Sequence, residues 1–355
     1  MSNMKQIAKM ANVSLGTVSH VLNGSAPVRE PLKRRVLEAV ESLGYQPSQL
    51  ARGLRRDKTN MVGMIIPDLT NPFFPAVVRG AEDIAFSNGY RLILCNTDND
   101  HAKELAHLDQ LRTYLPAGLI VIPSHFSDLT AQTESYRKAG TAVVCVDRLP
   151  KHWKGDSVTA DNEAGSYAAI LHLLNLGHRQ FAAIIGPQHL TNAQERLAGF
   201  KRALRQRRVT INPEYIQETT FDKQGGYAKT LLLLRLIPRP TVIFAGNDLM
   251  ALGSLLAIRD SGLRCPEDIS VMGFDDLDLG EIINPSLSSV SQPGYQLGST
   301  AARLMLDRVR GDTGPAKHLV LGTTLKIRHS TAPPQQQPAR ASGAKTRRKR
   351  RSAGR

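Results

Sequence analysis

The 355-residue sequence lacks any apolar run close to the roughly 20 residues that a membrane-spanning helix needs. A membrane protein is therefore excluded. The first residues also lack the charged segment, apolar stretch and small-residue cleavage site of a secretory signal, so we expect a cytoplasmic protein. Only three cysteines are present, Cys95, Cys145 and Cys265, and no two have C-x-x-C spacing. Disulfides and zinc sites are not expected, and the three thiols are predicted to lie in the core.

Catalytic signatures are missing as well. The sequence holds no G-x-S-x-G elbow, no P-loop and no H-E-x-x-H motif. Gly186-Pro187 and Gly225-Gly226 do not make a dinucleotide fingerprint. We therefore expect no enzyme, no cofactor and no metal.

Positive charge is abundant, and it is concentrated at the ends of the chain. The formal net charge is +15, of which residues 1–58 contribute +6 and residues 331–355 contribute +8, leaving +1 for the 272 residues between. Lysine and arginine bind nucleic acid by displacing condensed counterions, so this distribution favours a polyanionic partner met at the termini. A merely solubilising tail is the alternative for residues 331–355.

The first 45 residues have the periodicity of three short helices. Met4–Ala11 places its apolar residues on one face and is followed by Asn12, which tolerates a tight turn. Ser14 can cap a second helix with Val18, Val21 and Leu22 on one face. A third helix has Pro31 in its first turn and ends at Gly44. This pattern predicts a helix-turn-helix unit.

From Met61 to about His329, short β-rich apolar runs alternate with helical stretches, which is typical of parallel sheets flanked by helices. At about 270 residues this body is large for one open sheet, so two α/β lobes with a cleft between them are expected. The predicted strands are Val62–Ile66, Leu92–Cys95, Leu119–Ile122, Ala142–Val146, Ala182–Ile185, Val242–Ala245 and Ile269–Phe274. The predicted helices are Val77–Ser87, Glu104–Tyr114, Ala164–Leu176, Arg196–Arg205 and Leu249–Ser261.

The predicted organisation has four parts. Residues 1–46 form the helix-turn-helix domain, and residues 47–58 form a hinge too short for a stable helix by itself. Residues 59–330 form the two-lobed body, with lobe 1 at about 59–160 and 293–322 and lobe 2 at about 161–292 and 323–330. Residues 331–355 lack apolar periodicity and are expected to be disordered.

Several motifs resemble the lactose/galactose repressor family of bacterial transcriptional regulators, over roughly residues 4–330 and in the right order. In the head they are Gln6-Ile-Ala-Lys-Met-Ala-Asn-Val-Ser, Thr17-Val-Ser-His-Val-Leu-Asn and Gly44-Tyr-Gln-Pro. The hinge and body contribute Leu50-Ala-Arg-Gly-Leu, Ile66-Pro-Asp-Leu-Thr-Asn-Pro-Phe-Phe, Arg196-Leu-Ala-Gly-Phe, Gly246-Asn-Asp-Leu-Met-Ala-Leu-Gly and Gly273-Phe-Asp-Asp. The resemblance implies a repressor that binds a palindromic double-stranded operator as a homodimer, under the control of a small molecule.

The resemblance implies that the second helix reads the major groove. Its matching positions are Leu15, Gly16, Thr17, Ser19, His20 and Asn23. Hydroxyls, an imidazole and a short apolar side chain can reach base edges and a thymine methyl. His20 stands where many relatives have arginine, and Gly16 offers no side chain, so this helix should make few base contacts. A merely solvated helix face is the alternative.

The hinge resembles the family segment that folds on DNA and inserts a leucine into the minor groove. Leu54 matches that leucine, while Ala51, Arg52 and Arg55 are placed at the same interface. An apolar wedge kinks the duplex at a cost of a few kcal/mol, offset by a wider contact surface. The alternative is that Leu54 packs on the body.

The resemblance also implies an effector site built from strand ends of both lobes. Carboxylates, amides and a forked guanidinium can bind vicinal hydroxyls while an aromatic ring stacks on a sugar face, so a sugar-like effector is expected. Leu190 and Asn192 depart from the polar pair of purine-binding members and argue against a nucleobase. The matching positions are Phe73, Asp147, Asp161, Asn192, Arg196, Phe221, Asn247 and Asp275.

Two other classes of protein stay open at this point. A transport-type sugar-binding protein has a similar two-lobed fold, but the missing signal and the helix-turn-helix head argue against it. A nonspecific, nucleoid-like DNA binder would act through the basic ends alone. Whether the effector releases the protein from DNA or holds it there does not follow from the sequence, since linkage permits either sign.

Overall fold

The computed structural model describes residues 4–23, 26–45, 59–124 and 129–335. The predicted hinge contacts Ala51, Arg52, Leu54 and Arg55, and the basic tail from residue 336, lie outside these ranges. Within them, no helix is both long enough and apolar enough to cross a membrane.

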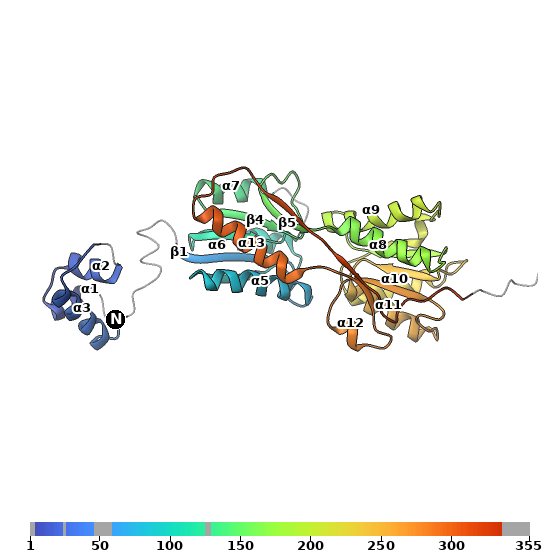
Figure 1. The fold of residues 1–355 in the computed structure, drawn as a ribbon, viewed down its shortest axis with the longest axis horizontal. Helices are drawn as coiled ribbons and strands as arrows, with labels where there is room; N and C mark the ends of the chain where they lie inside the picture. Colours follow the sequence, from blue (N-terminus) through green and yellow to red (C-terminus); the bar gives the residue numbers. More distant parts are fainter. Residues whose placement is uncertain (1–3, 24–25, 46–58, 125–128, 336–355) are drawn as a thin grey trace, which may run out of the picture. The chain divides into compact units, whose positions relative to one another are not determined.

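The head consists of three short helices around a small core, as the sequence predicts (Figure 1). They are α1 (Met4–Ala11), α2 (Leu15–Asn23) and α3 (Glu30–Ser42). Asn12 has a φ of 47° and Gly44 a φ of 57°, which confirms the turn and the helix end expected at these residues. The core of the head is formed by Ile7, Ala11, Val18, Val36 and Ala39.

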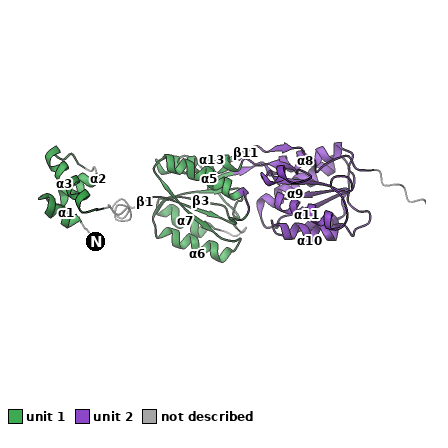
Figure 2. Ribbon diagram, turned by 90° about the horizontal axis from the view of Figure 1, so that it is seen from below, with its two compact units in different colours: residues 1–70, 74–158, 294–319 green, residues 71–73, 159–293, 320–355 purple. Residues whose placement is uncertain are grey.

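The rest of the described chain divides into two compact units (Figure 2), and the head is grouped with the first of them. Unit 1 includes residues 74–158 and 294–319, and unit 2 includes residues 159–293 and the chain from residue 320 onward. The chain therefore passes from unit 1 to unit 2 and back before it enters unit 2 again.

Unit 1 is built on a six-stranded sheet with the order β11-β5-β4-β3-β1-β2. Neighbouring strands from β5 to β2 are parallel, and the apolar runs of the inner strands are buried because helices cover both faces, whereas the edge strand β2 is only partly buried. Figure 2 shows α5 and α13 on one side of the sheet and α6 and α7 on the other. The strands are β1 (Thr59–Ile66), β2 (Arg91–Asn96), β3 (Pro116–Val121), β4 (Ala142–Val146), β5 (Asp156–Ala160) and β11 (His318–Leu321); the helices are α5 (Phe73–Ser87), α6 (His101–Arg112), α7 (Thr130–Lys138) and α13 (Gly294–Val309).

Unit 2 has a second six-stranded sheet, ordered β12-β10-β9-β8-β6-β7, in which only the β10–β12 pair is antiparallel. The strands are β6 (Phe181–Ile185), β7 (Ile216–Glu218), β8 (Val242–Ala245), β9 (Ser270–Asp275), β10 (Ser288–Ser291) and β12 (Thr324–Lys326). The helices are α8 (Asn162–Asn175), α9 (Thr191–Gln206), η1 (Pro213–Tyr215), α10 (Lys223–Leu233), α11 (Asp248–Asp260) and α12 (Leu279–Ile282).

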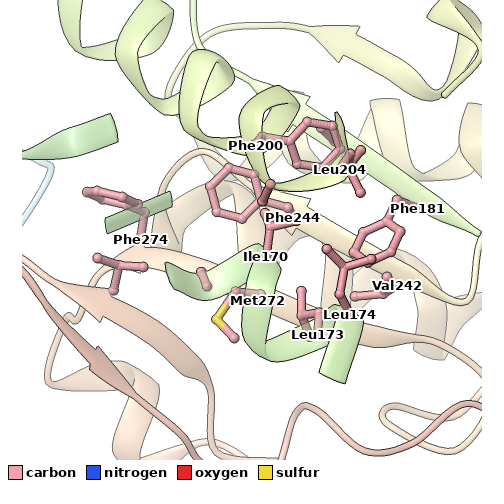
Figure 3. Packing of buried hydrophobic residues seen from close by; sticks show 14 of the residues in the cluster. Ile170, Leu173, Leu174, Phe181, Phe200, Leu204, Val242, Phe244, Met272 and Phe274 are labelled. Carbon is pink, nitrogen blue, oxygen red and sulfur yellow. The ribbon is translucent and has the colours of Figure 1, made fainter. Parts of the chain in front are cut away.

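Alternation along the strands of unit 2 divides its core in two. Val242 and Phe244 of β8 point into a cluster with α8 and α9, whereas Ile243 and Ala245 point into a cluster with α10 and α11. Figure 3 shows the first cluster, in which the rings of Phe200 and Phe244 stack with centroids 5.9 Å apart. Both faces of the sheet are therefore apolar at its centre, which is why β6 and β8 read as continuous hydrophobic runs.

Each predicted strand and helix of the body is present, with ends shifted by a few residues. The elements absent from the prediction are β5, β7, β10, β11, β12, α7, α10, α12, α13 and the short helix η1. The predicted start of the disordered tail needs a correction, because residues 331–335 are described and bonded to unit 2. The backbone N–H of Ala332 donates to Ser270 Oγ (3.1 Å), and its carbonyl accepts from His178 Nε2 (2.9 Å).

Candidate effector and DNA-binding sites

Polar side chains gather at the carboxyl edge of the sheet in unit 2. Gly246 and Asn247 directly follow β8, and Asp275 is the last residue of β9. Helix α9 begins shortly after β6 and carries Arg196. Carboxyl ends of parallel strands meet at one edge of a sheet, where open α/β folds bind their ligands.

Arg196 is almost completely buried, with 3% of its surface exposed. Its Nε donates to Asn162 Oδ1 (3.0 Å) and its Nη1 to the Gly246 carbonyl (2.5 Å). The guanidinium carbon also lies 3.9 Å from the centre of the Phe274 ring and 5.7 Å from that of Phe221. A buried cation needs such partners, since an uncompensated charge is costly in the interior.

Asp275 forms an ion pair with Arg196, in which Asp275 Oδ1 lies 3.5 Å from Arg196 Nη1. The same oxygen accepts a 2.7 Å hydrogen bond from Gln292 Nε2. Its φ is 112°, a backbone conformation that L-residues rarely adopt and that costs of the order of 1–3 kcal/mol. The surrounding contacts hold the carboxylate in place despite that strain, which is typical of ligand-binding positions.

Asp248 holds the backbone turn that follows Asp275 through hydrogen bonds. The buried carboxylate accepts from the Leu277 backbone N–H (2.7 Å) and from Ser289 Oγ (2.6 Å). Burial, followed by the nearby charge of Asp275, raises the pKa of Asp248 to about 8. Asp248 is thus a positioning residue for the Asp275 turn.

Asn247 and Phe221 extend the cluster. Asn247 Oδ1 accepts from the Met250 N–H (2.9 Å) as the N-cap of α11, while its Nδ2 donates to the Phe221 carbonyl (3.2 Å). A methyl group on Gly186 would lie 2.1 Å from the Phe221 ring, so this glycine serves close packing beside the ring.

Two other predicted effector residues of unit 2 lie at helix starts. Asp161 is the N-cap of α8 and accepts from the Ala164 N–H at 3.0 Å. Asn192 is buried in the first turn of α9, four residues before Arg196, so the two share a helix face.

Unit 1 supplies Asp147, which follows β4 with a φ of 63°. Its Oδ2 lies 3.4 Å from Nε of the buried Arg148, and the Arg148 guanidinium lies 5.6 Å from the centre of the Phe74 ring. Phe73, the first residue of α5, is buried and is grouped with unit 2. The sequence predicts Asp147 and Phe73 as effector contacts, and it did not single out their neighbours Arg148 and Phe74.

The structure therefore brings Arg196, Phe221, Asn247 and Asp275 into one cluster. Sequence reasoning missed its supporting residues Asn162, Phe274 and Gln292. Phe274 could not be singled out because it belongs to an apolar strand that looks like any other buried strand. Gln292 has no local signal, since its contact with Asp275 spans 17 residues. The part of the chain that the structure describes holds no group of three His, Cys, Asp or Glu side chains suited to a metal.

In the head, α2 presents its predicted reading face outward. Leu15 is 44% exposed and His20 is also exposed, whereas Val18 on the opposite face is fully buried. Ser14 Oγ accepts from the Thr17 backbone N–H (3.0 Å), which confirms the predicted cap. Thr17 Oγ1 lies 2.9 Å from Ser14 Oγ, and a methyl group added to Gly16 would make an ordinary 3.6 Å contact with the same Ser14 Oγ.

The remaining predicted positions of α2 are Ser19, which is partly exposed, and Asn23, the last residue of the helix. Arg35 of α3 donates to the carbonyls of Ala11 and Asn12, the second at 3.0 Å. This arginine therefore secures the turn between α1 and α2, and with it the angle at which α2 is presented.

A helix-turn-helix head followed by two parallel-sheet α/β units, one of them with a buried polar cluster at its strand edge, defines a ligand-responsive DNA-binding regulator. Residues 3–48 match the family model of bacterial regulatory proteins of the lacI family, and residues 170–331 match that of a periplasmic binding protein-like domain. The chain belongs to the lacI family of bacterial regulatory proteins and is a DNA-binding transcriptional regulator.

Similar proteins include the HTH-type transcriptional repressor PurR of Aliivibrio fischeri, 37% identical over 87% of this chain and 92% of the relative. A lacI family transcriptional regulator from Enterococcus faecium, solved with bound ribose, is 34% identical with a TM-score of 0.69, covering 78% of this chain and all of that one. The lac repressor dimer bound to operator and the anti-inducer ONPF is 25% identical to this chain, with a TM-score of 0.82. The match covers 93% of this chain and 99% of the lac repressor chain. That these relatives are regulators confirms the prediction of a repressor-type regulator rather than an enzyme.

Proposed function

We propose that this regulator represses transcription in the cytoplasm by binding a palindromic operator as a homodimer, with its affinity set by a sugar or sugar derivative. The observation that carries the effector assignment is the buried Arg196–Asp275 pair at the carboxyl edge of the unit 2 sheet. Two fixed, oppositely charged groups beside an aromatic ring suit a polyol, which offers hydroxyls that both donate and accept.

Neighbouring residues support a sugar over a flat nucleobase. Leu190 is buried and offers no hydrogen bond from its side chain, while Phe221 supplies a ring beside the Arg196 guanidinium. The ribose bound by the Enterococcus faecium relative is consistent with this choice. Asp147, Asp161, Phe73, Asn192 and Asn247 are proposed as further contacts.

For DNA, we propose that Leu15, Gly16, Thr17, Ser19, His20 and Asn23 face the major groove. The exposure of Leu15 and His20 and the burial of Val18 support this orientation of α2. Ala51, Arg52, Leu54 and Arg55 are proposed as hinge contacts, with Leu54 as the minor-groove wedge. The operator-bound dimer of the lac repressor is the relative that supports a dimeric arrangement.

The test has two parts. A sugar and sugar-acid library, with D-ribose as the first member, is screened against the full chain by thermal shift, because a ligand that binds only the folded state raises the melting temperature, and the rise grows with the logarithm of ligand concentration above the dissociation constant. The operator is selected from random palindromes at constant salt, and its affinity is then measured with and without each hit. A regulator that binds scrambled palindromes equally well would be a nonspecific DNA binder, and the absence of any sugar hit would contradict the effector class.

A further inference from the structure

A cavity lies on unit 2, away from the Arg196–Asp275 pair. It has a volume of about 980 Å³, at the upper end of the range for small-molecule sites. Its walls come from the second half of α9, the segment that follows it and the edge strand β7. We call it the α9–β7 groove; its lining residues are Ile185, Gln188, Leu197, Lys201, Leu204, Arg205, Arg208, Val209, Thr210, Ile211, Pro213, Ile216 and Glu218.

The floor of the α9–β7 groove is apolar. Leu197, Val209, Ile211 and Ile216 are only partly buried, and they pack against the core cluster that Figure 3 shows, which includes Leu204. Strand β7 is three residues long and forms the end of the sheet, so no further strand from the described residues pairs with it. The core of unit 2 therefore reaches the surface here as an open apolar trough.

One rim of the groove is basic. Lys201, Arg205 and Arg208 repeat at intervals of four and three residues, which places them on one stripe of α9 and its end. All three are exposed, and none forms an ion pair with an acidic residue in the described ranges. Arg208 has a φ of 54°, and its N–H donates to the Arg205 carbonyl (3.0 Å), so the chain turns there and keeps the third cation beside the groove.

Glu218, the acidic residue among the lining residues, already accepts a hydrogen bond from the backbone. Glu218 Oε1 accepts from the Gln188 backbone N–H at 2.9 Å. Three cations therefore face one carboxylate across an apolar floor, and the groove carries a net positive charge.

From this combination we propose that the α9–β7 groove binds an amphipathic anion, a carboxylate carried on an apolar chain. The apolar chain would cover the apolar floor and remove it from water, and the carboxylate would face Lys201 and Arg205. The basic end of this protein and a second copy of the groove are poor occupants, because both bring further positive charge. This site is separate from the Arg196 cluster: Arg196 projects from the first half of α9 toward Asn162 and Gly246.

Decanoate, below its critical micelle concentration, is the probe. Calorimetric titration of the full chain should give saturable binding of one molecule per chain, and neutral decanamide should bind at least tenfold more weakly. The double variant Lys201→Glu/Arg205→Glu should weaken decanoate binding at least tenfold. The matched control Lys223→Glu/Lys326→Glu reverses two exposed cations of the same unit outside the groove, and it should change the affinity less than twofold.

A second variant separates the groove from the proposed effector site. Ile211→Trp fills the groove, so it should abolish decanoate binding while the melting temperature stays close to that of the wild type. Asp275→Asn should leave decanoate binding unchanged. No saturable binding, equal weakening by both charge-reversal variants, or loss of binding in Asp275→Asn instead of Ile211→Trp would each overturn the proposal.

Discussion

The guanidinium carbon of Arg196 lies 3.9 Å from the centre of the Phe274 ring while its Nη1 faces the Asp275 carboxylate at 3.5 Å. Two consecutive residues at the end of β9 therefore hold one side chain of α9, the first through its ring and the second through its charge. The arginine is fixed before any ligand arrives, so binding requires little further ordering of this side chain.

The first prediction is that Arg196→Ala and Asp275→Asn remove the effector response and leave operator affinity within about threefold of the wild type. Both residues lie in unit 2 and neither belongs to the head. Operator binding by fluorescence anisotropy, with and without the identified sugar, measures both quantities.

Arg202→Ala is the control for this experiment. Arg202 belongs to the same helix but is exposed and pairs with Glu163 at the surface, so its loss should not change the response. A folded, dimeric Arg196→Ala or Asp275→Asn protein that no longer binds DNA would indicate a corepressor-dependent regulator or a wrong site assignment.

The second prediction concerns pH. His178 is buried between Thr241 Oγ1 and the Ala332 carbonyl, each 2.9 Å from a ring nitrogen, and burial lowers its pKa to about 4. An unfolded histidine has a pKa near 6.5, so the unfolded chain binds more protons between these two values. His178 should therefore contribute a loss of about 2 kcal/mol in unfolding free energy as the pH falls from 7 to 5.

Urea unfolding at pH 7 and pH 5 checks this. His178→Gln should be less stable than the wild type at pH 7 but should lose less stability on acidification. A variant with the same pH dependence as the wild type would show that other groups account for the effect.

The third prediction is that the segment Lys345–Arg351 adds salt-dependent affinity without sequence preference. Each phosphate contact adds about 0.9 to the slope of log affinity against log salt. Truncation after Gln335 keeps the hydrogen bonds of Ala332 and should flatten that slope while the preferred operator stays the same. A slope equal to that of the full chain would show that these basic residues do not contact DNA.

The fourth prediction concerns Gly53, which precedes the proposed wedge Leu54 and lies outside the described residues. Glycine costs roughly 0.8–1 kcal/mol relative to alanine within a helix, and a dimer has two hinges. Gly53→Ala should therefore tighten operator binding by up to about thirtyfold and blunt the effector response. Weaker operator binding by the variant would instead indicate that the glycine permits a close approach to DNA or to the partner hinge.

The fifth prediction tests the reading face of α2. Leu15→Ala and His20→Ala should each weaken specific operator binding by an amount typical of a lost base contact, about 1–3 kcal/mol. Arg34→Ala is the matched control, because Arg34 is an exposed cation of α3 paired with Glu38. If both variants bind scrambled and selected operators as the wild type does, another face of the head reads the DNA.

The sequence predicted those parts of the structure that depend on neighbours along the chain. The head followed from helical spacing, from the cap at Ser14 and from the turn residues Asn12 and Gly44, because these signals act within a few residues. The central strands followed from their continuous apolar runs. Strand β10, Ser288–Ser291, did not, because its polar residues have no such signal and their pairing with β9 and β12 determines the strand.

The proposed effector site divides in the same way. Family motifs placed Arg196, Asn247 and Asp275 on strand ends and helix starts, but only the tertiary structure showed that Phe274 and Asn162 hold Arg196 and that Gln292 holds Asp275. The α9–β7 groove has no sequence signal at all, since Leu197 and Ile216 look like ordinary core residues. Local periodicity and charge determined which residues form each element, whereas long-range packing decided which apolar residues stay open to solvent and which buried charges meet.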